Sequence, residues 1–302
     1  MRHFARTRLL ACVHRASRMH AIRTVKGGEG VMELEHSDIR NMLEVAIVAA
    51  RLGGQRAMEE IRYLKSTLKG DEEMVSNADV LCQKLIIERI KENYPDHGFL
   101  AEEGGDKALL KQPPRSEQDI WWVIDPIDGT NNYCHGLLCF GVSIAVVYQG
   151  RPIVGVIFDP ATERMYTAAT EMEAQCDGSR ITVSDEKISR LASFGLDSHL
   201  RPEQIEPVQE VVRRTRFRNL GTTALHLAYV AKGSMVGMLS NDAKLWDLAA
   251  GVFLVTTAGG RVEPLDGGEL FPVDCAAYEG RPYSFLATNG KTHDEFSKMF
   301  RL

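Results

Sequence analysis

The sequence lacks the features that mark several common classes of protein. None of its six cysteines forms a Cys-x-x-Cys pair, so a zinc or redox motif is not indicated. In a chain of 302 residues, these cysteines are more typical of free thiols in a reducing compartment than of a disulfide framework. No apolar run reaches the roughly 18–20 residues that span a bilayer. We therefore expect no membrane contact and a cytoplasmic protein.

Negative charge is almost absent from the first 31 residues, which carry six Arg and one Lys but only one acid, Glu29. Their formal charge of +6 leaves −11 for the rest of the chain, whose total is −5. An acidic body argues against nucleic acid as a partner and suits carboxylates that hold cations. The basic segment fits an organellar transit peptide, a disordered tail, or sequence upstream of a true start at Met32. We place residues 1–32 outside the fold, with an organellar location as the alternative.

The distribution of apolar residues predicts alternating helices and strands over residues 33–302. Helices are predicted at 37–65 (with Ser37 as N-cap), from 79 to a turn at 94–98, and at 203–214, 222–231, 247–257 and 292–300. Strands are predicted at 99–101, 120–124, 140–147, 153–158, 165–168, 217–220, 235–239, 261–263 and 284–287. The polarity of residues 69–76 predicts a loop. This order indicates one layered α/β unit, antiparallel in its middle part, with two lobes that meet near residue 185.

A hexapeptide, Asp125-Pro126-Ile127-Asp128-Gly129-Thr130, directly follows the predicted buried strand at 120–124. Two carboxylates three residues apart at a strand end suit a divalent cation, and Pro126 stiffens the exit because its ring fixes φ. Gly129 lets the backbone approach a ligand closely, and Thr130 can cap a following helical turn. Asp-Pro and Gly turns are common on their own, but the whole hexapeptide after a buried strand favours a metal site.

Acidic residues also lie at the ends of other predicted elements, at Asp79, Glu102-Glu103 and Asp247. Each has a simpler explanation when taken alone. Asp79 and Asp247 fit first-turn acids favoured by the helix dipole, and Glu102-Glu103 fits a solvated loop. Together with the hexapeptide they predict a cluster of carboxylates for hard cations, which take oxygen ligands. Histidines are not clustered with these acids, which argues against a zinc site.

These motifs, in this order, resemble those of the inositol monophosphatase superfamily of lithium-sensitive, metal-dependent phosphatases. The segments that carry the resemblance lie within residues 40–300, at 75–79, 101–103, 122–133, 221–224 and 246–251. The resemblance implies a mixed α+β fold, a layered α-β-α-β-α sandwich of the inositol monophosphatase and fructose-1,6-bisphosphatase type. It also implies a phosphoric monoester hydrolase that uses two or three Mg²⁺ ions, for which Mn²⁺ can substitute, and that forms a homodimer.

The resemblance further implies a set of metal ligands. Glu102, Asp125 and the carbonyl oxygen of Ile127 would hold one Mg²⁺. Asp125 would bridge to a second ion, which Asp128 and Asp247 complete. The chemistry of phosphate esters agrees with this ligand set, because two metals about 3.5–4 Å apart can clamp the attacking and leaving oxygens.

Catalytic and substrate-binding residues are implied in the same way. Asp79 and Thr130 would orient and deprotonate the attacking water, with Glu102 as a further catalytic residue and a third ion near Glu102 and Asp79. The substrate-binding residues would be Asp128, Gly129, Thr130, Gly221, Thr222, Thr223, Ser240 and Asp247.

The identity of the substrate is less determined than the chemistry. In inositol-specific members a Glu six residues before the Trp of the Trp-Asp motif contacts ring hydroxyls, and here that position is Ser240. Asp242 or Lys244 could recognise another leaving group, or residues 240–245 could simply end a strand. We expect an inositol-1-phosphate-like substrate first, then histidinol phosphate, then a sugar or nucleotide bisphosphate. A catalytically inactive, metal-binding regulatory homologue is the alternative from another class.

Overall fold

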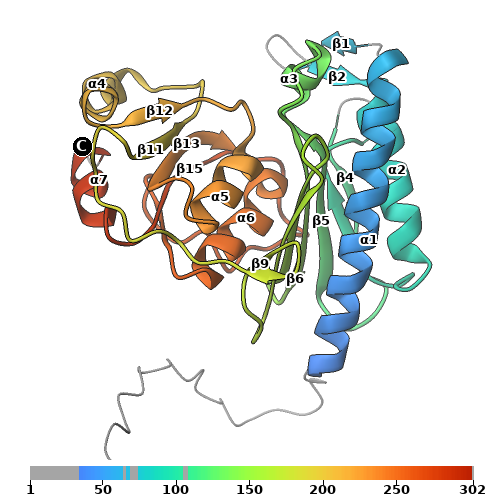
Figure 1. Ribbon diagram of the computed structural model, residues 1–302. Helices are drawn as coiled ribbons and strands as arrows, with labels where there is room; N and C mark the ends of the chain where they lie inside the picture. Colours follow the sequence, from blue (N-terminus) through green and yellow to red (C-terminus); the bar gives the residue numbers. More distant parts are fainter. Residues whose placement is uncertain (1–33, 64–65, 69–73, 105–107, 301–302) are drawn as a thin grey trace, which may run out of the picture. The chain divides into compact units, whose positions relative to one another are not determined.

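The computed structural model describes residues 34–63, 66–68, 74–104 and 108–300 (Figure 1). From Leu34 onward the chain forms one compact unit. Residues 1–32, for which a tail or a transit peptide is predicted, lie outside the described residues. Within the described part, five cysteines have free thiols, and no helix is both long and apolar enough to cross a membrane.

A sheet of eight strands forms the centre of the first half of the fold. Its strands are β3 (Gly98–Ala101), β4 (Leu110–Gln112), β5 (Ile120–Asp128), β6 (Gly141–Tyr148), β7 (Arg151–Asp159), β8 (Arg164–Ala169), β9 (Gln175–Cys176) and β10 (Ser179–Arg180). They are ordered β10-β9-β8-β7-β6-β5-β3-β4, with β3 and β5 parallel and the other pairs antiparallel. All of β5 is buried, and Trp121 and Trp122 pack into separate cores. Because successive side chains point to opposite faces, this sheet is covered on both sides.

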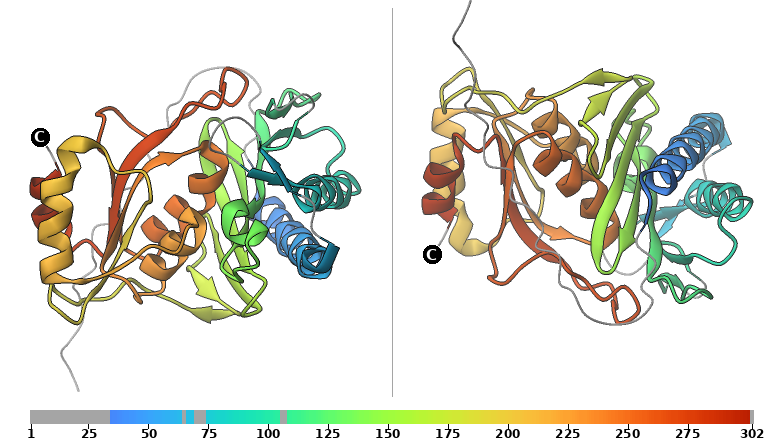
Figure 2. Two further views of the ribbon diagram at one scale, coloured as in Figure 1. Left: turned by 90° about the horizontal axis from the view of Figure 1, so that it is seen from above. Right: turned by 90° about the horizontal axis from the view of Figure 1, so that it is seen from below.

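Helices and a second sheet complete five layers (Figures 1 and 2). On one face of the eight-stranded sheet lie α1 (His36–Glu60) and α2 (Asn77–Lys91), and on the other lie α5 (Thr223–Ala231) and α6 (Leu245–Thr257). Beyond α5 and α6 is the second sheet, made of β11 (Ser193–Leu196), β12 (Arg216–Arg218), β13 (Gly237–Ala243), β14 (Arg261–Pro264) and β15 (Tyr283–Thr288), in the order β12-β11-β13-β15-β14. Its outer face is covered by α4 (Ile205–Arg214) and α7 (His293–Phe300). The predicted layered α-β-α-β-α sandwich is confirmed.

Some predicted boundaries were wrong for local reasons. The N-cap of α1 is Glu35 and not Ser37, because the side chains of Glu35 and Asp38 form a reciprocal capping box. This helix ends at Glu60 and gives way to a 3-10 turn, Ile61–Tyr63, short of the predicted residue 65. Polarity predicts a loop at 69–76, but β2 (Met74–Ser76) pairs with β1 (Ser66–Leu68) in an antiparallel ladder. The short strands β4 and β11 were not predicted, since three or four residues carry little periodic pattern.

Candidate active site

The end of β5 brings Asp125 and Asp128 to one site. The pairing of β5 with β6 is regular up to Asp125 and resumes at Asp128, with a shift in register between them. Pro126 lies in this irregular stretch, where its missing N–H interrupts no ladder bond. The N–H of Ile127 donates to Asp125 Oδ1 (3.0 Å), which fixes the carboxylate beside the irregularity. Residues three apart on a regular strand would point to opposite faces, so this irregularity is what lets both carboxylates face the same cavity.

Asp247 reaches the same site from the first turn of α6. Its Oδ2 accepts a hydrogen bond from the backbone N–H of Lys244 (2.7 Å), as the third residue of a capped helix does. Ser143 of β6 donates to the carbonyl oxygen of Trp246 (2.8 Å). The start of α6 is therefore fastened to the strand that pairs with β5, which sets Asp247 opposite Asp125.

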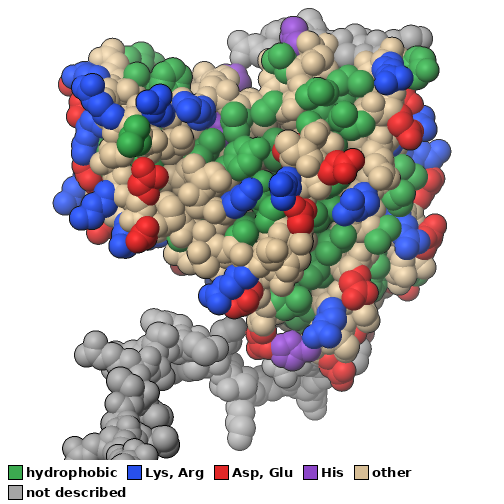
Figure 3. Space-filling model, in the orientation of Figure 1, with side chains coloured by type: hydrophobic (Ala, Val, Ile, Leu, Met, Phe, Trp, Pro, Cys, Tyr) green, Lys and Arg blue, Asp and Glu red, His purple; other side chains and the backbone are tan. Residues whose placement is uncertain are grey.

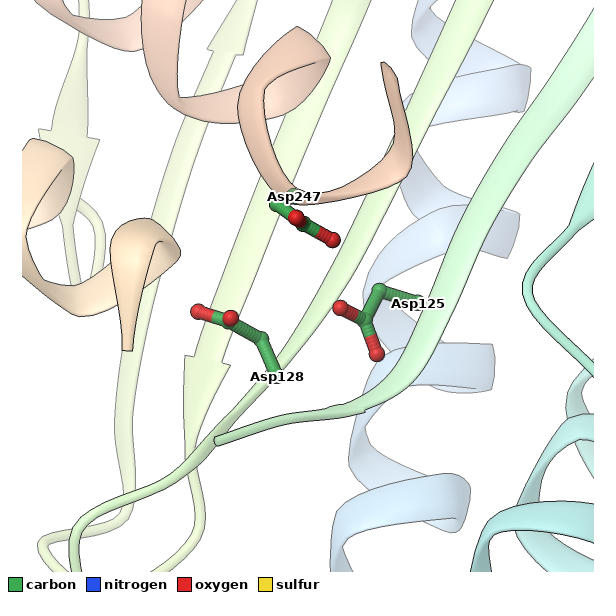
Figure 4. A group of neighbouring side chains, drawn as sticks. All are labelled: Asp125, Asp128 and Asp247. Carbon is green, nitrogen blue, oxygen red and sulfur yellow. The ribbon is translucent and has the colours of Figure 1, made fainter. Parts of the chain in front are cut away.

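The carboxylate oxygens of Asp125, Asp128 and Asp247, one from each residue, lie within 4.8 Å of one another (Figure 4). Burial raises the pKa of Asp125 well above its ordinary value, and the charges of Glu102, Asp247 and Asp128 raise it further. Burial also raises the pKa of Asp128 to about 6 and that of Asp247 to about 8. A group of oxygen donors without His or Cys suits a hard divalent cation, which would neutralise the repulsion between these carboxylates.

Asp128 is also held by the N-terminus of α5. Its Oδ2 accepts from the backbone N–H of Ala224 (2.6 Å) and from the hydroxyl of Thr222. Thr222 is the N-cap of α5, and its hydroxyl oxygen accepts from the N–H of Leu225 (3.3 Å). These hydrogen bonds lower the pKa of Asp128 and so oppose the effect of burial. The second half of the fold thus positions a carboxylate that the first half supplies.

Asp79 and Thr130 form a hydrogen-bonded pair. Asp79 is fully buried in the first turn of α2, where it accepts from the N–H of Ser76 (2.9 Å), and burial raises its pKa to about 6. The hydroxyl of Thr130 can donate to Asp79 Oδ1 or to the carbonyl oxygen of Ile127, each 3.0 Å away. The prediction that Thr130 caps the following helix was wrong. The N-cap of α3 (Thr130–Cys134) is Gly129, with φ of 100°, so the hydroxyl of Thr130 is available to Asp79.

Two cavities with partly shared walls hold the predicted site residues. The first, of about 220 Å³, is lined among others by Glu102, Asp125, Ile127, Asp128, Gly129, Thr130, Thr223 and Asp247. The second, of about 480 Å³, is lined among others by Asp128, Gly221, Thr222, Thr223 and Ser240. Asp79 is not part of either lining and reaches the site through Thr130. Glu103, next to Glu102, instead exchanges backbone hydrogen bonds with the side chain of Gln83.

Sequence reasoning did not single out several residues of the cavity walls, namely Asn131, Asn132, Asp197, His199 and Asn219. Asn132 donates to the carbonyl oxygens of Cys139 (2.7 Å) and Leu220 (2.6 Å), which ties the segment after α3 to the loop before α5. Asn131 and Asn132 directly follow the hexapeptide, so their position was a usable signal. Asp197 follows β11, a strand too short to predict, and the sequence offered no comparable signal for it.

Comparison with known proteins agrees with this fold. The chain matches the model of the inositol monophosphatase family over residues 38–296. It is 36% identical over 239 residues to Nus factor SuhB of Pasteurella multocida, which covers 76% of this chain and 87% of that protein. The solved structure of Thermotoga maritima IMPase matches with a TM-score of 0.74 and 30% identity, over 86% of this chain and 96% of that one. The extragenic suppressor protein suhB of Bartonella henselae matches with a TM-score of 0.76 and 28% identity, over 86% and 98%. The chain therefore belongs to the inositol monophosphatase family.

Proposed function

We propose that this chain is a Mg²⁺-dependent phosphatase that hydrolyses the phosphate monoester of a small metabolite. The proposal is carried by the cluster of Asp125, Asp128 and Asp247, whose carboxylate oxygens lie within 4.8 Å of one another and line a cavity. Carboxylates this close repel one another unless protons or a cation neutralise them. The likeness to Thermotoga maritima IMPase, at 30% identity, supports the same conclusion.

The donor set fits Mg²⁺ because it consists of oxygen atoms around a cavity that leaves room for water and substrate. We assign one ion to Glu102, Asp125 and the carbonyl oxygen of Ile127, and a second to Asp125, Asp128 and Asp247. When bound, such ions polarise the phosphate and lower the pKa of a bound water. Mn²⁺ also prefers oxygen ligands and is expected to substitute.

The pair Asp79 and Thr130 is assigned to the attacking water. A water that donates a hydrogen bond to Thr130 Oγ is connected to Asp79 through this hydroxyl, since Thr130 Oγ and Asp79 Oδ1 are 3.0 Å apart. A proton can then pass through the hydroxyl to the carboxylate, which is general-base catalysis within hydrogen-bond reach. Glu102 lines the same cavity and is assigned both to the metal and to catalysis, with a third ion near Glu102 and Asp79.

The phosphate and the leaving group are assigned to different parts of the cavities. Gly129 and Thr130, at the start of α3, are proposed to donate backbone N–H groups to the phosphate. The leaving group is assigned to the second cavity, where Gly221, Thr223 and Ser240 form part of the wall. An inositol-1-phosphate-like ester is the first candidate substrate, before histidinol phosphate and the sugar or nucleotide bisphosphates.

A panel of esters tests the proposal. Phosphate release from myo-inositol 1-phosphate, histidinol phosphate, fructose 1,6-bisphosphate and a nucleoside 3′,5′-bisphosphate is measured with Mg²⁺, with EDTA, and with added Li⁺. We expect turnover that requires Mg²⁺ and that Li⁺ inhibits. No Mg²⁺-dependent turnover on any of the esters would overturn the proposal. Light scattering of the same protein tests the expected homodimer.

A second candidate function follows from the names of the relatives. The matched proteins of Pasteurella multocida and of Escherichia coli K12, the latter 33% identical over 265 residues, are both named Nus factor SuhB. The chain also has an exposed edge strand, β12, with Phe217 between two arginines, and Figure 3 shows Lys and Arg side chains gathered over α4 and β12. We keep a factor role, with or without catalysis, as the alternative. The prediction that no nucleic acid is bound stays a prediction.

Complementation separates the two functions. The wild-type chain and the variant Asp125→Asn are expressed in an Escherichia coli K12 strain from which SuhB has been removed, and any growth defect is scored. Equal rescue by both would favour a factor role that does not need the metal cluster. Rescue by the wild type alone would favour catalysis.

A further inference from the structure

The second cavity carries an acidic group that the metal cluster does not use. Asp197 lines both cavities, together with Asp128. It directly follows β11, whose parallel pairing with β13 sets Leu196 opposite Leu239 and therefore Asp197 beside Ser240. Its side chain is 19% exposed, so the carboxylate is held in the wall and still reaches the cavities.

The surrounding protein fixes the orientation of this carboxylate. Oδ2 of Asp197 accepts from the hydroxyl of Ser240 (3.0 Å) and from the backbone N–H of Asn241 (3.1 Å). Oδ1 accepts from the backbone N–H groups of Ser198 (2.6 Å) and His199 (3.4 Å). Three donors at 3.1 Å or less hold the carboxylate in one orientation, and the long contact to His199 leaves Oδ1 a lone pair for a ligand.

Positive charge is scarce in the walls around Asp197. The lining of the second cavity includes no Lys or Arg among the described residues. The first cavity is lined by Lys244, whose Nζ lies 3.6 Å from Asp242 Oδ1 and is thus partly neutralised. The ring of His199 is exposed, with Nδ1 3.8 Å from Asp197 Oδ1. A ligand in the second cavity therefore meets the carboxylate of Asp197 without a Lys or Arg side chain among the described lining residues.

A purely structural role would account for part of this geometry. The contacts of Asp197 with Ser198 and His199 are those of an ordinary turn after a strand. They do not account for the exposure of the same carboxylate to both cavities, nor for its support by Ser240 and Asn241 from a different strand. A carboxylate that the protein holds in one orientation beside a polar cavity is the arrangement that recognises donor groups of a ligand.

We propose that Asp197 determines specificity by accepting hydrogen bonds from the leaving group of the substrate, and that it disfavours leaving groups that carry a second phosphate. The proposal rests on the phosphatase function proposed above. The shared chemistry of the favoured leaving groups is a set of donors, supplied either by neutral hydroxyls or by a protonated amine. At neutral pH a second phosphate is mostly a dianion, which has no donors and would be repelled by Asp197.

The test compares esters that differ in the leaving group. Values of kcat and KM are measured for myo-inositol 1-phosphate, histidinol phosphate, fructose 1,6-bisphosphate and methyl phosphate, each with Mg²⁺. The variant Asp197→Asn keeps the size of the side chain and removes its charge. The control is Asp185→Asn, because Asp185 is exposed and lines neither cavity.

The expected result is a change in the ratio between kcat/KM for each ester and kcat/KM for methyl phosphate. Relative to methyl phosphate, Asp197→Asn should lower kcat/KM for the hydroxyl-bearing or the amine-bearing ester about tenfold or more, mainly through KM. The same ratio for fructose 1,6-bisphosphate should rise. Whichever of the two donor-bearing esters loses more identifies the source of the donors. Unchanged ratios for all three esters would overturn the role of Asp197 while leaving the phosphatase intact, whereas a wild type that hydrolyses none of the esters would overturn both proposals.

A second variant covers a folding defect in Asp197→Asn. Ser240→Ala removes one donor to Asp197 but leaves its charge, and thermal unfolding monitors the fold of each variant. If Asp197→Asn lacks the native unfolding transition, Ser240→Ala decides the question. A fall of about threefold in the inositol or histidinol ester ratio would support the proposal, and no fall would contradict it.

Discussion

The two walls of the candidate site differ in how their charged groups are surrounded. The inner wall consists of Asp125, Asp128 and Asp247, whose carboxylates face one another and whose pKa values are raised, mainly by burial. The outer wall is built around Asp197 and Ser240, where backbone N–H groups and a hydroxyl surround a single carboxylate. The carboxylates of the inner wall therefore need a positively charged ligand to balance their charge. The carboxylate of the outer wall is already satisfied by hydrogen bonds from the protein.

This difference implies that the inner wall serves the chemical step and that the outer wall serves the recognition of the substrate. A substitution in the inner wall should abolish turnover and, without metal, relieve repulsion between carboxylates. A substitution near the outer wall should change KM or stability and leave the chemical step nearly intact. If the two walls are separable in this way, substitutions in each should change different kinetic constants.

The largest effect is expected from Asp125→Asn, which removes the proposed bridge between two ions. The loss of a metal-stabilised transition state should lower kcat/KM by about 10³-fold or more, because metal ions contribute several kcal/mol to such steps. In EDTA the variant should unfold at the same or a higher temperature than the wild type, since one buried carboxylate has been neutralised. Phosphate-release assays and thermal unfolding measure both, with Asp185→Asn as the control. Activity near that of the wild type would remove Asp125 from its bridging role.

Thr130→Ala is expected to have the next largest effect. Loss of the hydroxyl that contacts Asp79 should lower kcat about 10²-fold, within the range of general acid–base catalysis. The matched variant Thr130→Ser keeps the hydroxyl and should stay within about tenfold of the wild type. Steady-state kinetics on one ester give both values. Equal losses in the two variants would show that the methyl group, and not the hydroxyl, is what matters at this position.

The inner wall also predicts how metal and pH act together on stability. In the folded protein without metal, the pKa values of Asp128 and Asp247 are about 6 and 8, above the roughly 3.9 of an unfolded Asp. The folded state therefore keeps these protons to higher pH, and the stability they contribute at low pH is lost as the pH rises from about 4 through 8. Mg²⁺ takes the place of the protons, so it should raise Tm more at about pH 8 than at about pH 5. Thermal scans with Mg²⁺ and with EDTA measure the difference, and equal rises at both pH values would contradict it.

The same contrast explains what the sequence alone could predict. The inner wall draws two of its carboxylates from one hexapeptide, and its third residue, Asp247, adjoins a tryptophan in a short motif. Local spacing therefore carried most of the information, and the buried run before Asp125 predicted the strand that positions it. The register shift that turns Asp128 toward Asp125 was not predictable, because it depends on the partner strand β6.

The outer wall could not be derived in this way. Its residues come from separate elements, and Asp197 follows a four-residue strand without recognisable periodicity. Ser240 was singled out only as a departure from a family pattern, and its contact with Asp197 joins residues 43 positions apart in the chain. Such contacts are fixed by how β11 and β13 pair, which is a property of the assembled sheet.

The smallest effect is expected at Gly221, where the outer wall meets Asn132. Gly221 has φ of 65°, and a Cβ there would lie 2.8 Å from Asn132 Nδ2. Gly178 offers a matched control, since its φ is 76° and nothing lies within 4 Å of its Cβ position. Gly178→Ala should therefore cost only the backbone strain, about 1–2 kcal/mol of unfolding free energy. Gly221→Ala should cost more, because Asn132 must also move from the carbonyl oxygens that it bonds.

Activity gives this pair of variants a second readout. A displaced Asn132 would shift the wall of the second cavity, so Gly221→Ala should raise KM a few-fold with kcat nearly unchanged, and Gly178→Ala should change neither. Denaturant unfolding and steady-state kinetics on both variants supply the comparison. A fall in kcat as large as that of Thr130→Ala would mean that the outer wall is coupled to the inner wall, and the separation between recognition and chemistry would fail at this glycine.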